Sequence, residues 1–262
     1  MNVFKRSSLA DGNGIPHFAI PEIVALGWLT HAFLTRRGGV SPAPYDSLNL
    51  GYRTKDPVEN VDANYGRVGR AFGIGLDGLV LLDQVHGDRI LVLRNRLPKL
   101  TRPLHYDALI TDLAGMTLGI RTADCLPALI VDPRKKVVAA AHAGRVGTGL
   151  GILPRVIEEM GKAFGSRPGD LLVALGPAIG LCCYEVDEEV FLPQWKPFSV
   201  ETGPGRWRID VPGFNLAQVR EAGVPEDRTF FVDLCTRCEE DLFFSHRRHP
   251  QTGRQLSFIG IV

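Results

Sequence analysis

Apolar residues recur along this chain with two periods, one typical of helices and one typical of strands. In residues 58–72 they stand three or four positions apart, which predicts an amphipathic helix despite two internal glycines. Residues 150–164 have the same spacing, with Pro154 acceptable only near the first turn. We also expect a helix within residues 210–222, following Pro212, and a short acidic helix at residues 186–191.

Short apolar or alternating runs between these segments predict strands. They cover residues 28–35, 79–85, 89–93, 106–111, 116–120, 126–131, 137–141, 171–175, 230–232 and 255–261. Residues 1–16 read as a mobile N-terminal strand or tail because two glycines and a proline interrupt them. No repeat or convincing linker divides the chain, so we expect one α+β domain over residues 1–262, with mixed β-sheets.

One predicted hairpin brings reactive side chains together. The runs at residues 126–131 and 137–141 flank a turn that contains a proline and three basic residues. A turn centred between Arg134 and Lys135 pairs His142 with Pro127 and sets Cys125 diagonally across from His142, about 7–8 Å away at the backbone. A slip of one residue would put the thiol and the imidazole on opposite faces.

The runs at residues 79–85 and 89–93 indicate a second hairpin with His86 at its tip. Together His86, Cys125 and His142 offer three ligands and leave one position open, as in a catalytic zinc site. Such a set would also accept copper. The alternative is a buried cysteine and two hydrogen-bonded histidines, since no short-range metal motif joins the three.

Other chemically suggestive patterns are weaker. Cys235 and Cys238 form a single CxxC pair, which is half a zinc site, and Cys182 and Cys183 are adjacent. We interpret both pairs as structural or incidental. The glycine-rich residues 144–151 match neither the Walker nor the dinucleotide pattern, although they could offer backbone N–H groups to an anion.

Composition narrows the class of protein. Hydrophobic residues make up 45% of the 262 positions and charged residues 23%, as in an ordinary packed domain. A net charge of +1 gives no sign of a nucleic-acid or membrane surface, and no run reaches membrane-spanning length. The odd number of cysteines, five, and the absence of a secretory leader favour a reducing cytoplasm.

Several segments resemble the signatures of a known family. They are Thr35–Ser41, Ser47–Gly51, Asp83–Gly87, Asp107–Thr111, Thr122–Pro127, His142–Gly144, Gly176–Val186 and Phe243–Arg248. The sequence is thereby similar to the laccase-domain, or polyphenol-oxidase-like, family, now associated with purine nucleoside phosphorolysis and adenosine deamination. The resemblance runs from about residue 28 onward.

The resemblance implies a layered α+β fold, likened to the cytotoxic-necrotizing-factor and cysteine-hydrolase folds, with zinc bound by His86, Cys125 and His142. Copper is a further cofactor that the family's name suggests. Purine nucleosides and phosphate are the implied partners, for a monomer or homodimer. Residues expected to act in catalysis are Cys125, His142, His86 and Asp124, with Asp107 as another proton carrier. Residues expected to bind substrate or phosphate are Arg37, Asn49, Gln84, Arg121, Arg145 and Arg248.

One segment departs from the family pattern. The family usually reads His-Ala-Gly-Trp-Arg-Gly, whereas this chain has Arg145-Val146 in the place of Trp-Arg. If the segment shapes the pocket, substrate preference differs here.

Three alternatives to a zinc phosphorylase remain open. Cys125 could be a nucleophile activated by His142 in a metal-free hydrolase or deamidase. A copper-dependent polyphenol oxidase is a second alternative, although multicopper chemistry needs more paired histidines than the seven scattered ones here. The third is a protein that binds a metal or a nucleoside without catalysis.

Overall fold

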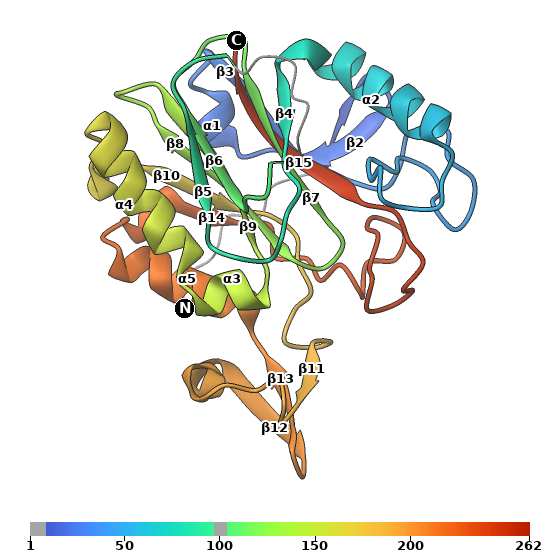
Figure 1. Cartoon of the computed structure of the whole chain (residues 1–262), viewed down its shortest axis with the longest axis vertical. Coiled ribbons are helices and arrows are strands. Elements are labelled where there is room, and N and C mark those ends of the chain that lie inside the picture. Colours follow the sequence, from blue (N-terminus) through green and yellow to red (C-terminus); the bar gives the residue numbers. More distant parts are fainter. Residues whose placement is uncertain (1–8, 97–103) are drawn as a thin grey trace.

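Two six-stranded sheets face each other and helices cover their outer sides, as Figure 1 shows. This computed structural model describes residues 9–96 and 104–262. The first sheet has the order β1-β2-β3-β15-β7-β4 and the second β14-β10-β8-β9-β6-β5. A mixed α+β fold was predicted, and it is confirmed.

The strands of the first sheet are β1 (Leu9–Gly12), β2 (Ile15–Phe18), β3 (Leu29–Leu34), β15 (Gln255–Ile261), β7 (Thr117–Thr122) and β4 (Leu79–Leu81). Those of the second are β14 (Thr229–Phe231), β10 (Leu172–Leu175), β8 (Leu126–Asp132), β9 (Val137–Ala143), β6 (Ala108–Thr111) and β5 (Ile90–Leu93). Of the predicted N-terminal strand or tail, residues 9–12 form β1, residues 13–14 a turn and residues 15–16 the start of β2. Residues 1–8 lie outside the described part.

Both faces of the second sheet are buried, which explains its almost uninterrupted apolar sequence. Leu109, Leu129 and Ala140 point into the core shared with the first sheet. Their neighbours in the chain point to the other side, where they pack against α4 (Ile152–Phe164) and α5 (Val211–Glu221). Side chains alternate along a strand, so a strand covered on both sides needs apolar residues at successive positions.

The outer face of the first sheet packs against α2 (Val58–Phe72), whose bounds are those predicted. Val61, Tyr65 and Val68 contact side chains of β3 and β15 there. The remaining helices are short: α1 (Pro21–Val24), α3 (Arg145–Gly149), and the 3-10 turns η1 (Leu76–Gly78), η2 (Pro168–Asp170), η3 (Pro193–Phe198) and η4 (Glu226–Arg228). No helix within residues 9–96 and 104–262 has both the length and the apolarity that a membrane span requires.

Two local predictions are wrong. The segments around His86 do not form a hairpin, because β4 pairs with β7 in the first sheet and β5 pairs with β6 in the second. The expected acidic helix at residues 186–191 is instead β11 (Glu185–Asp187) followed by a turn. The glycine-rich residues 144–151, for which neither phosphate-binding pattern was matched, include the short helix α3.

β11 belongs to a third sheet that the sequence did not reveal. It joins β13 (Arg206–Ile209) and β12 (Ser199–Gly203) in the order β11-β13-β12. This small sheet extends away from the two large ones in Figure 1. Val186 pairs with Trp207, so tertiary pairing overrides the helical spacing of the local sequence.

Candidate metal centre and substrate cavity

Two histidines and a cysteine meet near the end of the β8–β9 hairpin. His142 stands opposite Pro127 in the register predicted from the turn, and Cys125 directly precedes β8. His86 comes from the segment between β4 and β5. One ligand atom from each of the three lies within 4.8 Å of the others. Cys125 and His142 therefore converge as the register required, and His86 joins them by a different connection from the one expected.

Asp107, immediately before β6, fixes two of the three ligands. Its Oδ1 accepts hydrogen bonds from the His86 backbone N–H and from Nδ1 of His142, both at 2.9 Å. Its Oδ2 accepts the backbone N–H of Gly87 at 2.8 Å. These bonds hold His86 at a φ of 60°, a left-handed value that few residues adopt. Asp107 is fully buried, so it serves as an orienting carboxylate.

The donor set suits a single divalent metal ion. With Nδ1 of His142 engaged by Asp107, its Nε2 is left for a metal, beside the thiol of Cys125 and the ring of His86. Two imidazoles and one thiolate match zinc with a fourth position left open. Gly144 allows this close approach, because a Cβ there would lie 3.1 Å from the Cys125 sulfur and 3.3 Å from the His86 ring.

The ionisation of this group is shifted by its own members. Burial would raise the pKa of Cys125, but the positive charge and hydrogen bond of His142 lower it to about 6. Burial would likewise lower the pKa of His142, but the Cys125 thiolate and Asp107 raise it to about 9. Burial also opposes ionisation of Asp107, yet hydrogen bonds from His142 and the backbone hold its pKa below the usual range. Without a metal, both shifts favour a thiolate at Cys125 beside an imidazolium at His142.

All three ligands open onto a cavity of about 630 Å³, a volume within the range of small-molecule sites. The other side chains and backbone that line it come from segments spread over the whole chain. They are Gly51, Arg53, Thr54, Asp83, Gln84, Arg121, Thr122, Ala123, Asp124, Arg145, Val146, Ile179, Tyr184, Val211, His246, Arg247 and Arg254. Five arginines against two aspartates make this lining basic.

Two of the arginines are held near each other by strand pairing. Arg121 lies on β7 opposite Leu256 of β15, and Arg254 immediately precedes β15. Burial, with the nearby charge of Arg121, lowers the pKa of Arg254 against the opposing influence of Cys125 and Asp124. Two guanidinium groups close together on a cavity wall favour an anion between them.

Three other residues expected at the site line the cavity. Gln84 exchanges hydrogen bonds with the backbone of Arg121, at 2.8 and 2.9 Å, and so fixes the strand that carries this arginine. Arg145 donates to the carbonyl of Val190. Asp124 has a φ of 99°, and its carboxylate accepts bonds from Thr236 Oγ1 and the Arg247 N–H, both at 2.7 Å. These bonds indicate that Asp124 helps to position the segments that carry Thr236 and Arg247.

Three other expected binding residues do not line the cavity. Arg37 donates to the carbonyl of Asp241 and borders a separate surface hollow. Asn49 is buried, and its Oδ1 accepts the backbone N–H groups of Gly51 and Arg254, so it supports the lining from behind. Arg248 donates to the carbonyls of Thr236, Arg237 and Phe243.

The sequence interpretation missed Arg53, Arg254, Tyr184 and His246. No periodic pattern marks them, since each stands in a loop or beside a strand end. Tyr184 lies within a segment that carried the family resemblance, and its ring receives the guanidinium of Arg247 at 5.0 Å.

Known proteins share much of this sequence and its overall fold. The family described as multi-copper polyphenol oxidoreductase laccase matches residues 30–262. Purine nucleoside phosphorylase YlmD of Geobacillus stearothermophilus is 38% identical over 86% of this chain and 88% of its own length. A purine nucleoside phosphorylase of Deinococcus radiodurans is 37% identical over 95% and 94%. The crystal structure of YlmD from G. stearothermophilus superposes with a TM-score of 0.89 at 34% identity, covering 97% of this chain and 99% of that one.

Proposed function

We propose that this chain, which belongs to the multi-copper polyphenol oxidoreductase laccase family, is a purine nucleoside phosphorylase with zinc held by His86, Cys125 and His142. One observation carries the proposal: a three-ligand cluster opens onto a cavity lined by five arginines. The names of the two relatives above support the same reaction. The expected substrates are adenosine, inosine and methylthioadenosine.

In this reaction a phosphate oxygen bonds to the anomeric carbon of the ribose while the bond to the purine nitrogen breaks. The bonding electrons leave with the purine, which takes up a proton, and the products are the free base and the ribose 1-phosphate. Arg121 and Arg254, with the exposed Arg53 beside them on the lining, would hold the phosphate. The metal, when bound, would supply Lewis-acid chemistry at the cavity wall.

The purine needs an apolar surface, which Val146, Ile179 and Val211 offer. Val146 is 43% exposed and stands where the family pattern places the arginine of its Trp-Arg pair. Because neither Arg145 nor Val146 is aromatic, no ring at these positions can stack on the base. We expect this chain to rank nucleosides differently from relatives that keep the usual pair.

A product assay tests the proposal. Adenosine, inosine and methylthioadenosine are incubated with the zinc-loaded protein, with and without phosphate, and the products are identified by mass. Free base that appears only with phosphate supports phosphorolysis. Unchanged nucleosides under both conditions would leave a binding protein without catalysis and overturn the proposal.

A pair of arginine variants locates the phosphate. Arg121→Gln should raise the KM for phosphate about 10-fold or more, because one charge-assisted contact contributes roughly 1.5–3 kcal/mol. Arg37→Gln is the matched control, since this arginine lies outside the lining, and it should leave the KM unchanged. Equal effects of the two substitutions would contradict a phosphate site at Arg121.

Adenosine deamination is a second reaction that we propose for the same cavity. Three protein ligands leave a zinc ion one position for a water molecule, the arrangement that hydrolytic zinc enzymes use. Inosine formed from adenosine without phosphate would support it, and the same mass assay detects it.

A metal-free hydrolase or deamidase is the alternative with the best structural support. Cys125, His142 and Asp107 form a nucleophile, base and orienting acid in series, and the Cys125 pKa of about 6 provides thiolate at neutral pH. The likeness to the cytotoxic-necrotizing-factor and cysteine-hydrolase folds, which the family resemblance implies, is a further argument for this alternative. Protein that is active without metal and rapidly alkylated at Cys125 would favour it.

Copper-dependent phenol oxidation, suggested by the family description, has less support. All seven histidines lie in the described residues, and among those residues the candidate metal clusters contain two of them, His86 and His142. A multicopper centre needs several histidine pairs. We further propose that the protein is cytoplasmic, because an odd number of cysteines suits reducing surroundings. We propose a monomer or homodimer as its oligomeric state.

A further inference from the structure

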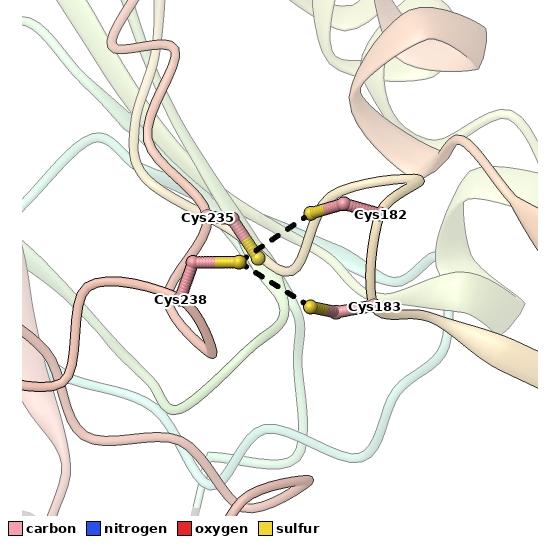
Figure 2. Close-up of side chains that lie close together, drawn as sticks. All are labelled: Cys182, Cys183, Cys235 and Cys238. Atoms are coloured by element: carbon pink, nitrogen blue, oxygen red, sulfur yellow. Dashed lines mark hydrogen bonds between the residues drawn. The ribbon is translucent and has the colours of Figure 1, made fainter.

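The four cysteines outside the cavity converge on one point although they come from two distant segments, as Figure 2 shows. β10 and β14 are parallel neighbours, so the chain leaves both strands at the same edge of the sheet. An isolated bridge then pairs Ala178 with Cys235, and the Thr236 N–H donates to the Ala178 carbonyl at 3.0 Å. The adjacent pair Cys182-Cys183 and the CxxC pair are thereby brought face to face.

The four sulfur atoms have the spacing of a tetrahedral metal site. Sγ of Cys238 lies 3.6 Å from that of Cys182 and 3.4 Å from that of Cys183. All four sulfurs lie within 4.8 Å of one another. With zinc–sulfur bonds of about 2.3 Å, the edges of an ideal tetrahedron are about 3.8 Å. One ion fits at the centre of this group.

The surroundings suit metal ligands rather than thiols packed in a core. Cys182 and Cys238 are exposed, so burial of apolar surface does not explain the cluster. The Gly180 N–H donates to the sulfur of Cys235 at 3.3 Å, and Arg237 donates to that of Cys183 at 3.5 Å. Such donors around the ligands are typical of metal–thiolate sites and offset their negative charge.

We propose that Cys182, Cys183, Cys235 and Cys238 bind a second zinc ion. Because all four positions are protein ligands, this site is closed and its function is structural. It joins the segment that carries Ile179 and Tyr184 to the segment that carries Arg247, and all three line the cavity. The second ion would bind whether or not the cavity accepts a nucleoside.

The test counts zinc per chain by elemental analysis after exhaustive dialysis. Wild-type protein should hold two zinc ions, Cys238→Ser one, and the double variant Cys125→Ser/Cys238→Ser none. Cys125→Ser is the matched control, because it also removes a single thiol and should leave one zinc, in the four-cysteine site. One zinc in wild-type protein that Cys238→Ser retains would overturn the proposal, as would iron in place of zinc or a disulfide among the four cysteines.

Cobalt gives a second measurement that leaves the four cysteines intact, in case Cys238→Ser fails to fold. The double variant His86→Ala/Cys125→Ser is reconstituted with Co²⁺ alone. Four thiolates around tetrahedral cobalt should give intense charge-transfer and visible bands with one equivalent bound. The absence of these bands in folded protein would also overturn the proposal. Neither result depends on nucleoside cleavage, so failure of the proposed enzyme activity remains distinguishable.

Discussion

The two clusters of candidate metal ligands differ in how the chain builds them and in what surrounds them. His142 of the first is almost fully buried, a buried carboxylate orients it, and the cluster faces the cavity. The second consists of the sulfurs of two exposed and two half-buried cysteines, and Arg237 donates a hydrogen bond to one of them. The comparison suggests a general difference. Three ligands that leave a coordination position open need a further residue, here Asp107, to hold them in place. Four ligands that close a site would instead hold together the chain segments that carry them.

The largest expected difference follows from removal of a ligand. His86→Ala should lower nucleoside cleavage about 100-fold or more, because a Lewis acid is worth several kcal/mol to the barrier. Cys238→Ser should lower the melting temperature instead, with a much smaller loss of cleavage at temperatures where it stays folded. Initial rates and thermal melts of both variants measure this contrast. Equal losses of cleavage in the two folded variants would remove the distinction.

The carboxylate behind the first cluster should matter next. Asp107→Asn should weaken zinc binding at His86, Cys125 and His142 by about 10- to 100-fold, since it disturbs the orientation of His142 and the His86 turn. Competition with a zinc chelator gives the affinity. The control is Asp132→Asn at the other end of the same hairpin, where a buried carboxylate accepts two backbone N–H groups of the turn. Similar zinc affinities in both variants would contradict the assigned part of Asp107.

A methyl group beside the first cluster should have a smaller effect. Gly144→Ala brings a Cβ to 3.1 Å from the Cys125 sulfur, so the ligands must shift by a few tenths of an ångström. We expect about 10-fold weaker zinc binding, the lower end of the usual cost of overpacking. Gly169→Ala is the control, because a Cβ there has no neighbour among the described residues within 4 Å. The zinc content of the four-cysteine site should not change in either variant.

The smallest expected effect is the loss of stability that protonation of His31 causes at acidic pH. It is the baseline against which acid effects on the two clusters are measured. Burial, helped by His17, lowers the pKa of His31 to about 4, and its unprotonated Nε2 accepts the Ile20 N–H. The unfolded chain protonates this histidine near pH 6.5, so its contribution to stability is complete above that pH and falls as the pH approaches 4. From pH 7 to pH 5.5 the loss is about 1 kcal/mol.

Denaturant unfolding of metal-free wild type and His31→Gln measures this contribution. The variant should show a flatter dependence of the free energy of unfolding on pH over that interval. Parallel curves would show that His31 does not titrate as described. Any further loss on acidification of the zinc-loaded protein then reports proton competition for the ligands.

The local pattern of apolar and turn residues correctly predicted those features that depend on residues close together in the sequence. The helix at residues 58–72 and the pairing of Pro127 with His142 follow from spacing and turn chemistry, and both are confirmed. Such features require contacts between residues close in the sequence, which periodicity records.

The parts that failed depend on long-range pairing. β4 and β5 look like the arms of a hairpin, yet each finds its partner in a different sheet. The four cysteines meet because β10 and β14 are adjacent, and no spacing in the sequence encodes that adjacency. Arg254 reaches the cavity for the same reason, through the position of β15 beside β7.

β15 follows every other element in chain order, yet it lies between β3 and β7 inside the first sheet. During synthesis, the edges of β3 and β7 that pair with β15 therefore have no native partner until β15 leaves the ribosome. Arg254, which precedes β15, enters the cavity only at that moment. We therefore expect a nascent chain that has made the three candidate metal ligands to expose two strand edges, a feature that favours aggregation, until β15 completes the sheet.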